Sequence, residues 1–163
     1  MGSGVSGLYS GTSGSSQNYA SKYSVVPSMK KKDEEQGIYS KDFGYKKNPT
    51  AINIQDAIVN NSVHINGKRM DGKITYVIDA NGNMIIGLRD KSSIQRSPHP
   101  RLVGGRNPEV KCAGMITFRK GRILSVDNDS GHYKPPKESM KWTYEALDKL
   151  PSYLFDKTFK RRK

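Results

Sequence analysis

Alternating hydrophobic and polar residues in the second half of the chain predict two β-hairpins. The segments ITYVID (74–79) and MIIGLR (84–89) flank Ala80-Asn81-Gly82, where glycine can take the positive φ of a tight turn. The segments CAGMITF (112–118) and RILSVDN (122–128) flank Lys120-Gly121 in the same way. Between them lies a polar stretch from residue 90 to 108, which we expect to be a loop.

The register of the second hairpin follows from pairing Arg119 with Arg122 across the turn. One face of the hairpin would then carry Met115, Thr117, Leu124 and Val126, and the other Ile116, Phe118, Ile123 and Ser125. Both faces hold apolar side chains. The pattern therefore predicts that this hairpin is central in its sheet and covered by helices on both sides.

Helical periodicity appears on either side of these strands. Asn48-Pro49-Thr50 can start a helix, and Ile54, Ala57 and Ile58 would share one face of residues 50–60. The segment VHINGKRM (63–70) follows, and we expect a short strand and a turn there. In PPKESMKWTYEALDKL (135–150), proline lies in the first turn, and a stripe at i, i+4 and i+7 consists of Met140, Tyr144 and Leu147.

These elements predict an α+β domain. It has an antiparallel sheet of about four to five strands built from hairpins, flanked by an N-terminal and a C-terminal helix. The expected organisation is a flexible Gly/Ser-rich leader and charged connector over residues 1–48, the domain over 49–156, and a basic tail over 157–163. Residues 1–29 repeat a Ser-Gly step and have a single charge, Lys22, so their apolar area is too small to offset chain entropy. The alternative is that this segment wraps the domain through Leu8, Tyr9, Tyr19 and Tyr23.

The chain is strongly basic. Its 163 residues include 28 Lys+Arg against 15 Asp+Glu, a formal net charge of +13. Lysine and arginine release condensed counterions from nucleic acid, so this excess favours nucleic acid or a nucleotide-like anion as the partner. The ribonuclease hypothesis given below makes RNA, ahead of DNA, the expected nucleic acid. The alternative is a basic surface that serves solubility.

Several classes of chemistry are not supported by the sequence. The single cysteine, Cys112, excludes an internal disulfide, and its apolar surroundings predict a buried thiol rather than a nucleophile. His64, His99 and His132 have no metal-ligand spacing, so we expect neither a metal site nor a cofactor. There is also no apolar run of 18 residues and no signal-peptide pattern, so we expect no membrane partner.

The segment SVDNDSGHYKPP (125–136) is the first candidate site. Asn128, Asp129 and Gly131 favour a sharp corner after a strand, and Pro135-Pro136 suit the start of a helix. Imidazole exchanges protons near neutral pH, which makes His132 a candidate acid or base. Tyr133 is a further catalytic candidate, and Ser130 and Lys134 are candidates for holding substrate. The alternative is that the histidine only packs at the junction between the strand and the helix.

The second candidate is the loop RSPHPRLVGG (96–105). Prolines on both sides of His99 predict an extended, exposed histidine, and Arg96 and Arg101 would suit a phosphate. A stiff surface connector is the alternative. If His99 and His132 were neighbours, they could form the acid/base pair of a metal-independent ribonuclease, since the RNA 2′-hydroxyl supplies the nucleophile.

The segment AGMITFRKGRILSVDNDSGHYKP (113–135) resembles the terminal portion of C-terminal domains of bacterial polymorphic toxins. That family includes nucleases, ADP-ribosyltransferases and deaminases. The order of a helix, an antiparallel sheet and a late histidine is also similar to the barnase/EndoU/RelE-like group of metal-independent ribonucleases. The similarity implies an acid/base role for His132 and assigns no residue as that group's glutamate. The paired cysteines of a zinc deaminase are missing.

Three functions follow as hypotheses. The leading one is a toxin-like ribonuclease that acts in the cytoplasm, exported within a larger carrier and bound by an acidic immunity protein. A second is an ADP-ribosyltransferase, although no Arg…Ser-Thr-Ser…Glu set is present. A third is a non-catalytic module whose basic face binds nucleic acid or an acidic protein.

Overall fold

The computed structural model describes residues 16–88 and 98–160. The helical elements in these ranges are α1 (Pro27–Glu35), η2 (Ile54–Ala57), η3 (His99–Leu102), η4 (Lys137–Ser139), α2 (Met140–Leu147) and η5 (Ser152–Leu154), where η denotes a 3-10 turn. The strands are β1 (Tyr39–Ser40), β2 (Gly44–Tyr45), β3 (Ile52–Asn53), β4 (Ile58–Val59), β5 (Ser62–Ile65), β6 (Lys68–Arg69), β7 (Gly72–Ile78), β8 (Met84–Gly87), β9 (Cys112–Arg119) and β10 (Arg122–Val126). The architecture is α+β, as the sequence predicts.

The central sheet has five antiparallel strands in the order β10-β9-β7-β8-β3. Both predicted hairpins are confirmed. Gly82 has φ +84° in the β7–β8 turn, and Lys120 and Gly121 have φ +53° and +79° in the β9–β10 turn. Arg119 pairs with Arg122 as expected, but the register shifts between Ile123 and Ser125, so Leu124 bulges out of the ladder. Beyond the bulge the predicted faces are wrong, because Ser125 pairs with Thr117 and Val126 with Ile116.

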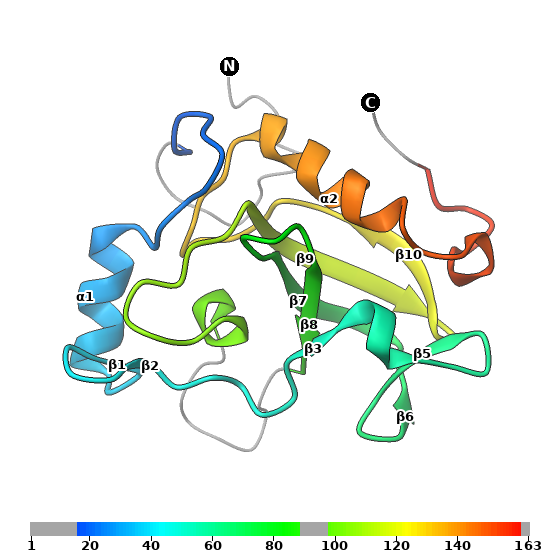
Figure 1. Cartoon of the computed structure of the whole chain (residues 1–163), viewed down its shortest axis with the longest axis horizontal. Coiled ribbons are helices and arrows are strands. Elements are labelled where there is room, and N and C mark those ends of the chain that lie inside the picture. Colours follow the sequence, from blue (N-terminus) through cyan, green and yellow to red (C-terminus); the bar gives the residue numbers. More distant parts are fainter. Residues whose placement is uncertain (1–15, 89–97, 161–163) are drawn as a thin grey trace.

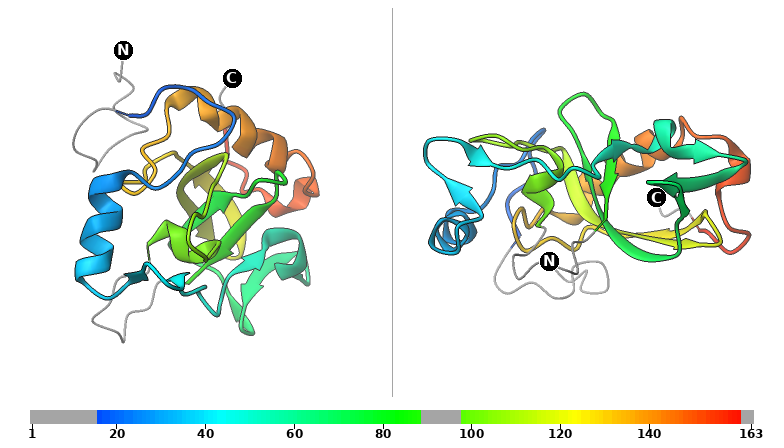
Figure 2. Two further views of the ribbon diagram at one scale, coloured as in Figure 1. Left: turned by 60° about the vertical axis from the view of Figure 1, so that its left-hand side comes forward. Right: turned by 90° about the horizontal axis from the view of Figure 1, so that it is seen from below.

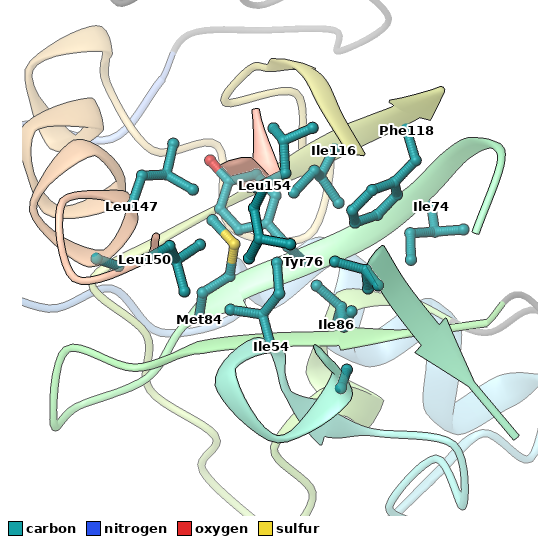
Figure 3. Close-up of a cluster of buried hydrophobic side chains, with 14 of the residues drawn as sticks. Ile54, Ile74, Tyr76, Met84, Ile86, Ile116, Phe118, Leu147, Leu150 and Leu154 are labelled. Carbon is teal, nitrogen blue, oxygen red and sulfur yellow. The ribbon is translucent and has the colours of Figure 1, made fainter. Parts of the chain in front are cut away.

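The larger hydrophobic core lies between one face of this sheet and α2, which runs across it (Figure 1). Figure 3 shows the side chains that meet there: Ile54, Ile74, Tyr76, Met84, Ile86, Ile116, Phe118, Leu147, Leu150 and Leu154. The predicted stripe of α2 faces this core, since Met140, Tyr144 and Leu147 are all buried. Each large apolar side chain buried in this way stabilises the fold by about 1.5–3 kcal/mol.

A second core covers the opposite face of the sheet, to which β7 and β9 contribute Val77 and Ala113. The rest of this core comes mostly from the N-terminal segment and from residues 102–133. Its buried members are Tyr23, Val25, Ile38, Tyr39, Tyr45, Val77, Leu102, Val110, Ala113 and Tyr133. Because β7 and β9 are covered on both faces, alternate residues of one strand are buried in different cores.

Two expectations about the N-terminal half differ from the structure. The predicted helix over residues 50–60 is wrong: the side chain of Asn53 caps a single 3-10 turn, and Ile58–Val59 then pairs with β5. The N-terminal helix is instead α1, which spans the end of the expected flexible leader and the start of the charged connector. Residues 16–48 pack onto the domain, because Tyr23, Tyr39 and Tyr45 are at most 8% exposed.

The expected central position of the β9–β10 hairpin is also wrong, because β10 is an edge strand of the sheet. Its outer edge is covered by the C-terminal segment, where Phe155 bridges Ile123 and the Asp156 N–H donates to the Ile123 carbonyl at 2.9 Å. Arg119 anchors that segment through an ion pair with Asp156 at 2.7 Å. A pairing segment rather than a helix therefore protects this edge.

Candidate functional site

The candidate site forms where α1 meets the corner after β10. His132 Nε2 lies 2.8 Å from Asp33 Oδ2, and the Tyr45 hydroxyl donates to the same oxygen at 2.6 Å. Asp33 is fully buried and His132 is 5% exposed. An ionised carboxylate only accepts hydrogen bonds, so Asp33 takes the Nε2–H of His132 and fixes the tautomer of the ring.

The other ring nitrogen of His132 has a different environment. In residues 16–88 and 98–160, Nδ1 of His132 makes no hydrogen bond. It is also not one of the fully enclosed unpaired polar atoms of these residues, which are Asn128 Oδ1 and Trp142 Nε1. A neutral imidazole that donates through Nε2 has its lone pair on Nδ1. Asp33 therefore leaves His132 with Nδ1 as the nitrogen that can accept a proton.

Local hydrogen bonds explain why the chain turns at this corner. The Ser130 hydroxyl accepts the Tyr133 N–H at 3.3 Å, and the Ser130 carbonyl accepts the Lys134 N–H at 2.7 Å. Lys134 takes φ +43°, a conformation in which few non-glycine residues are found. The Asn128 side chain spans the corner and donates to the Pro135 carbonyl at 2.9 Å. These contacts hold His132 in place relative to α1.

The N-terminal segment closes over the same corner. The Val26 N–H donates to the His132 carbonyl at 2.8 Å, and the Gln17 N–H donates to the Lys134 carbonyl at the same distance. Tyr23 pairs with Val110 on a neighbouring segment. The residues just before α1 therefore dock onto the chain around His132, and α1 brings Asp33 to the ring.

His99 lies beside this corner in a different role from the one predicted. Its prolines do not expose it: His99 begins the 3-10 turn η3 and is 6% exposed. Its Nε2 donates to the Gly114 carbonyl at 2.7 Å, and its Nδ1 lies 3.2 Å from the Ser130 hydroxyl. Both ring nitrogens are therefore engaged by the protein. The His99 ring is hydrogen-bonded to Ser130, whereas the His132 ring is hydrogen-bonded to Asp33 and not to His99.

The remaining predicted site residues have varied surroundings. The Tyr133 side chain is fully buried and donates to the Pro108 carbonyl at 2.7 Å. Burial raises the pKa of this phenol well above its ordinary value, so Tyr133 stays protonated and serves as a packing residue. Lys134 is half-buried, and Arg101 donates through Nε to the Lys46 carbonyl at 3.0 Å. Arg96 lies outside the described residues.

Sequence patterns did not indicate Asp33 or Tyr45. Asp33 lies in the run KKKDEE, which looks like a solvated charged surface, and nothing local distinguishes it from Glu34. Only the fold shows that it faces inward, 99 positions from its histidine. Asp33 can be recognised as a site residue only from its hydrogen bond to the buried His132 ring.

Cys112 is buried as predicted, and burial raises the pKa of its thiol. Within residues 16–88 and 98–160 no group of three or more His, Cys, Asp or Glu side chains is arranged to hold a metal ion. No helix in those ranges is long and apolar enough to cross a bilayer. The chain matches no protein-family model, no curated protein and no solved structure.

Proposed function

We propose that this protein is a basic, toxin-like domain that cleaves RNA by metal-independent acid/base chemistry, with His132 as the proton acceptor. The observation behind the proposal is that the two ring nitrogens of His132 have different hydrogen-bond environments. A buried carboxylate engages Nε2, which leaves Nδ1 without a partner among the described residues. The hydrogen bond to Asp33 holds the orientation of the imidazole ring. The net charge of +13 supports a polyanionic substrate.

In the proposed reaction, Nδ1 of His132 takes the proton of the RNA 2′-hydroxyl. The 2′-oxygen then forms a bond to the adjacent phosphorus while the bond from phosphorus to the 5′-oxygen breaks. The products are a 2′,3′-cyclic phosphate and a 5′-hydroxyl, and the departing oxygen takes its proton from water. Lys134 would stabilise the negative charge that develops on the phosphate oxygens. Ser130 is buried, and its hydroxyl is hydrogen-bonded to His99 and to the Tyr133 N–H, so it would support the corner that carries His132.

The test is to incubate the purified protein with total RNA in EDTA and to compare variants. We expect His132→Ala and His132→Gln to cleave at least about 100-fold more slowly, the usual contribution of a general base. The glutamine amide can still donate to Asp33 but cannot accept a proton. His64→Ala is the matched control, because His64 is on β5 and its Nδ1 lies 3.3 Å from the carbonyl of the nearby Ser62. It should cleave at the wild-type rate.

Thermal unfolding of each variant separates loss of chemistry from loss of fold. Cleavage should also produce ends with a 2′,3′-cyclic phosphate, which are identified by mass spectrometry. RNA that stays intact with the wild-type protein contradicts the proposal. Equal cleavage by wild-type protein and a folded His132→Gln variant contradicts the role of His132 as the proton acceptor.

A further inference from the structure

An exposed aromatic side chain lies at the tip of the β1–β2 hairpin. Phe43 is 84% exposed, far more than the other exposed large apolar residues of the described chain, of which Tyr153 is 46% exposed. Exposing a phenylalanine to water is unfavourable relative to burying it. Single exposed apolar residues are common on proteins, so the exposure of Phe43 gains meaning only from its surroundings.

The first feature of those surroundings is a rigid support. The Ser40 hydroxyl accepts the N–H groups of Asp42 and Phe43 at 3.1 and 3.2 Å. Arg106 donates through Nε and Nη2 to the Asp42 carbonyl, at 3.0 and 2.8 Å. The hairpin tip is therefore held in one conformation from within and from a neighbouring loop. Little conformational entropy would be lost if Phe43 contacted a ligand.

The backbone of the hairpin also packs directly on that loop. Tyr45 and Gly105 exchange two backbone hydrogen bonds at 2.8 and 2.9 Å. Gly44 has φ +76°, and a Cβ atom there would come within 2.1 Å of the Gly105 carbonyl carbon. Only glycine allows this approach. We name the unit formed by residues 39–47 and 101–106 the Phe43 platform.

The second feature is charge. The platform has one carboxylate, Asp42, and five cationic side chains: Lys41, Lys46, Lys47, Arg101 and Arg106. The three lysines are exposed, and Lys41 makes a long 3.9 Å ion pair with Glu34 of α1. The Arg101 and Arg106 side chains bind backbone carbonyls of the hairpin at Lys46 and Asp42, which neutralises neither guanidinium. These cationic side chains together attract a phosphate strongly when it lies within a Debye length, about 8 Å, of them.

We propose that the Phe43 platform binds single-stranded RNA, with Phe43 stacked on an unpaired base and the surrounding cations on the flanking phosphates. An exposed aromatic ring among lysines and arginines is the combination that binds single strands, because stacking needs an unpaired base and the cations follow the backbone.

The platform is joined to the candidate site by the chain itself. Tyr45, two residues after Phe43, donates its hydroxyl to Asp33, which binds His132. The choice of RNA rests on the proposed function, and the platform would be where its substrate docks. Binding itself does not depend on cleavage and can be measured separately.

The test uses His132→Gln as the background, so that the RNA stays intact if the protein cleaves it. Affinity for a fluorescein-labelled single-stranded RNA is measured by fluorescence anisotropy. Adding Phe43→Ala should raise Kd by about 5- to 150-fold, the range for loss of one stacked base, and Phe43→Tyr should restore binding. Binding should weaken steeply with salt and should favour the single strand over a duplex of the same sequence.

Tyr153→Ala is the matched control. It removes another exposed aromatic residue, in η5, which lies at the opposite end of the long axis from β1 and β2 (Figures 1 and 2). Its Kd should equal that of the background protein. An unchanged Kd for Phe43→Ala, or a duplex bound as tightly as the single strand, overturns the proposal that the Phe43 platform binds single-stranded RNA. The proposed cleavage by His132 is judged independently, from the RNA products of proteins with an intact histidine.

Discussion

Replacing Asp33 by alanine tests whether the contact between α1 and the corner at His132 stabilises the fold. The carboxylate is fully buried and accepts hydrogen bonds from Tyr45 and His132 at 2.6 and 2.8 Å. A hydrogen bond to a charged group contributes about 1.5–3 kcal/mol, and removing one partner of a buried pair costs about 3–5 kcal/mol. We therefore expect Asp33→Ala to lower the free energy of unfolding by about 3–5 kcal/mol, a large part of the roughly 5–15 kcal/mol typical of a domain.

The measurement is urea unfolding followed by circular dichroism. Glu34→Ala is the matched control, because Glu34 is the next residue of the same helix, is exposed and makes only a long 3.9 Å ion pair with Lys41. Its change should stay within about 0.5 kcal/mol. A double-mutant cycle of Asp33→Ala with Tyr45→Phe should give a coupling energy of about 0.5–3 kcal/mol. The reasoning is refuted if Asp33→Ala unfolds like Glu34→Ala, since the carboxylate would then be solvated in solution.

Three further variants test other contacts. Gly114→Ala should destabilise the protein by about 1–3 kcal/mol or more, because its Cβ would lie 1.8 Å from the Asp127 carbonyl oxygen. Gly131→Ala is the control: its Cβ would have no atom within 4 Å, so this variant should unfold at nearly the wild-type temperature. Tyr133→Phe should lower the unfolding free energy by about 1–3 kcal/mol yet leave RNA cleavage by the folded protein unchanged; a selective loss of cleavage would make Tyr133 catalytic after all. Hydrogen bonding from Arg119 holds the pKa of Asp156 well below its ordinary value of 3.8, so this stabilisation is complete at neutral pH and is lost only as the pH falls below that value. Asp156→Asn should therefore lower the melting temperature at neutral pH, and its difference from the wild type should shrink as the pH falls progressively below 3.8. A difference independent of pH would contradict the assignment.

The sequence predicted those parts of the fold that rest on local patterns. The turns at Asn81-Gly82 and Lys120-Gly121 need positive φ, and the helix after Pro136 has a continuous apolar stripe. Nothing comparable marks α1, whose only fully buried side chain is the charged Asp33. The expected helix at 50–60 failed because its short apolar spacing also suits a 3-10 turn, and the β-branched Ile58 and Val59 fit a strand.

The candidate site was predictable only in part. His132 and Ser130 stand in an unusual local sequence, so they could be chosen without a structure. Asp33 acts through a tertiary contact across 99 positions, which no local pattern encodes. His99 was expected to be exposed because prolines flank it, but Pro98 and Pro100 instead shape a 3-10 turn that directs the ring toward the Gly114 carbonyl.

The contact between Asp33 and His132 has a consequence for the order in which the protein is made. Synthesis proceeds from the N-terminus, so Asp33 emerges long before the residue that pairs with it. Until His132 has been added, neither the docking of Val26 on the corner nor the pairing of the carboxylate can occur. A chain that is interrupted before the last β-hairpin contains α1 but cannot assemble the imidazole site. The site can therefore form only after the whole segment from α1 to the corner after β10 has been synthesised.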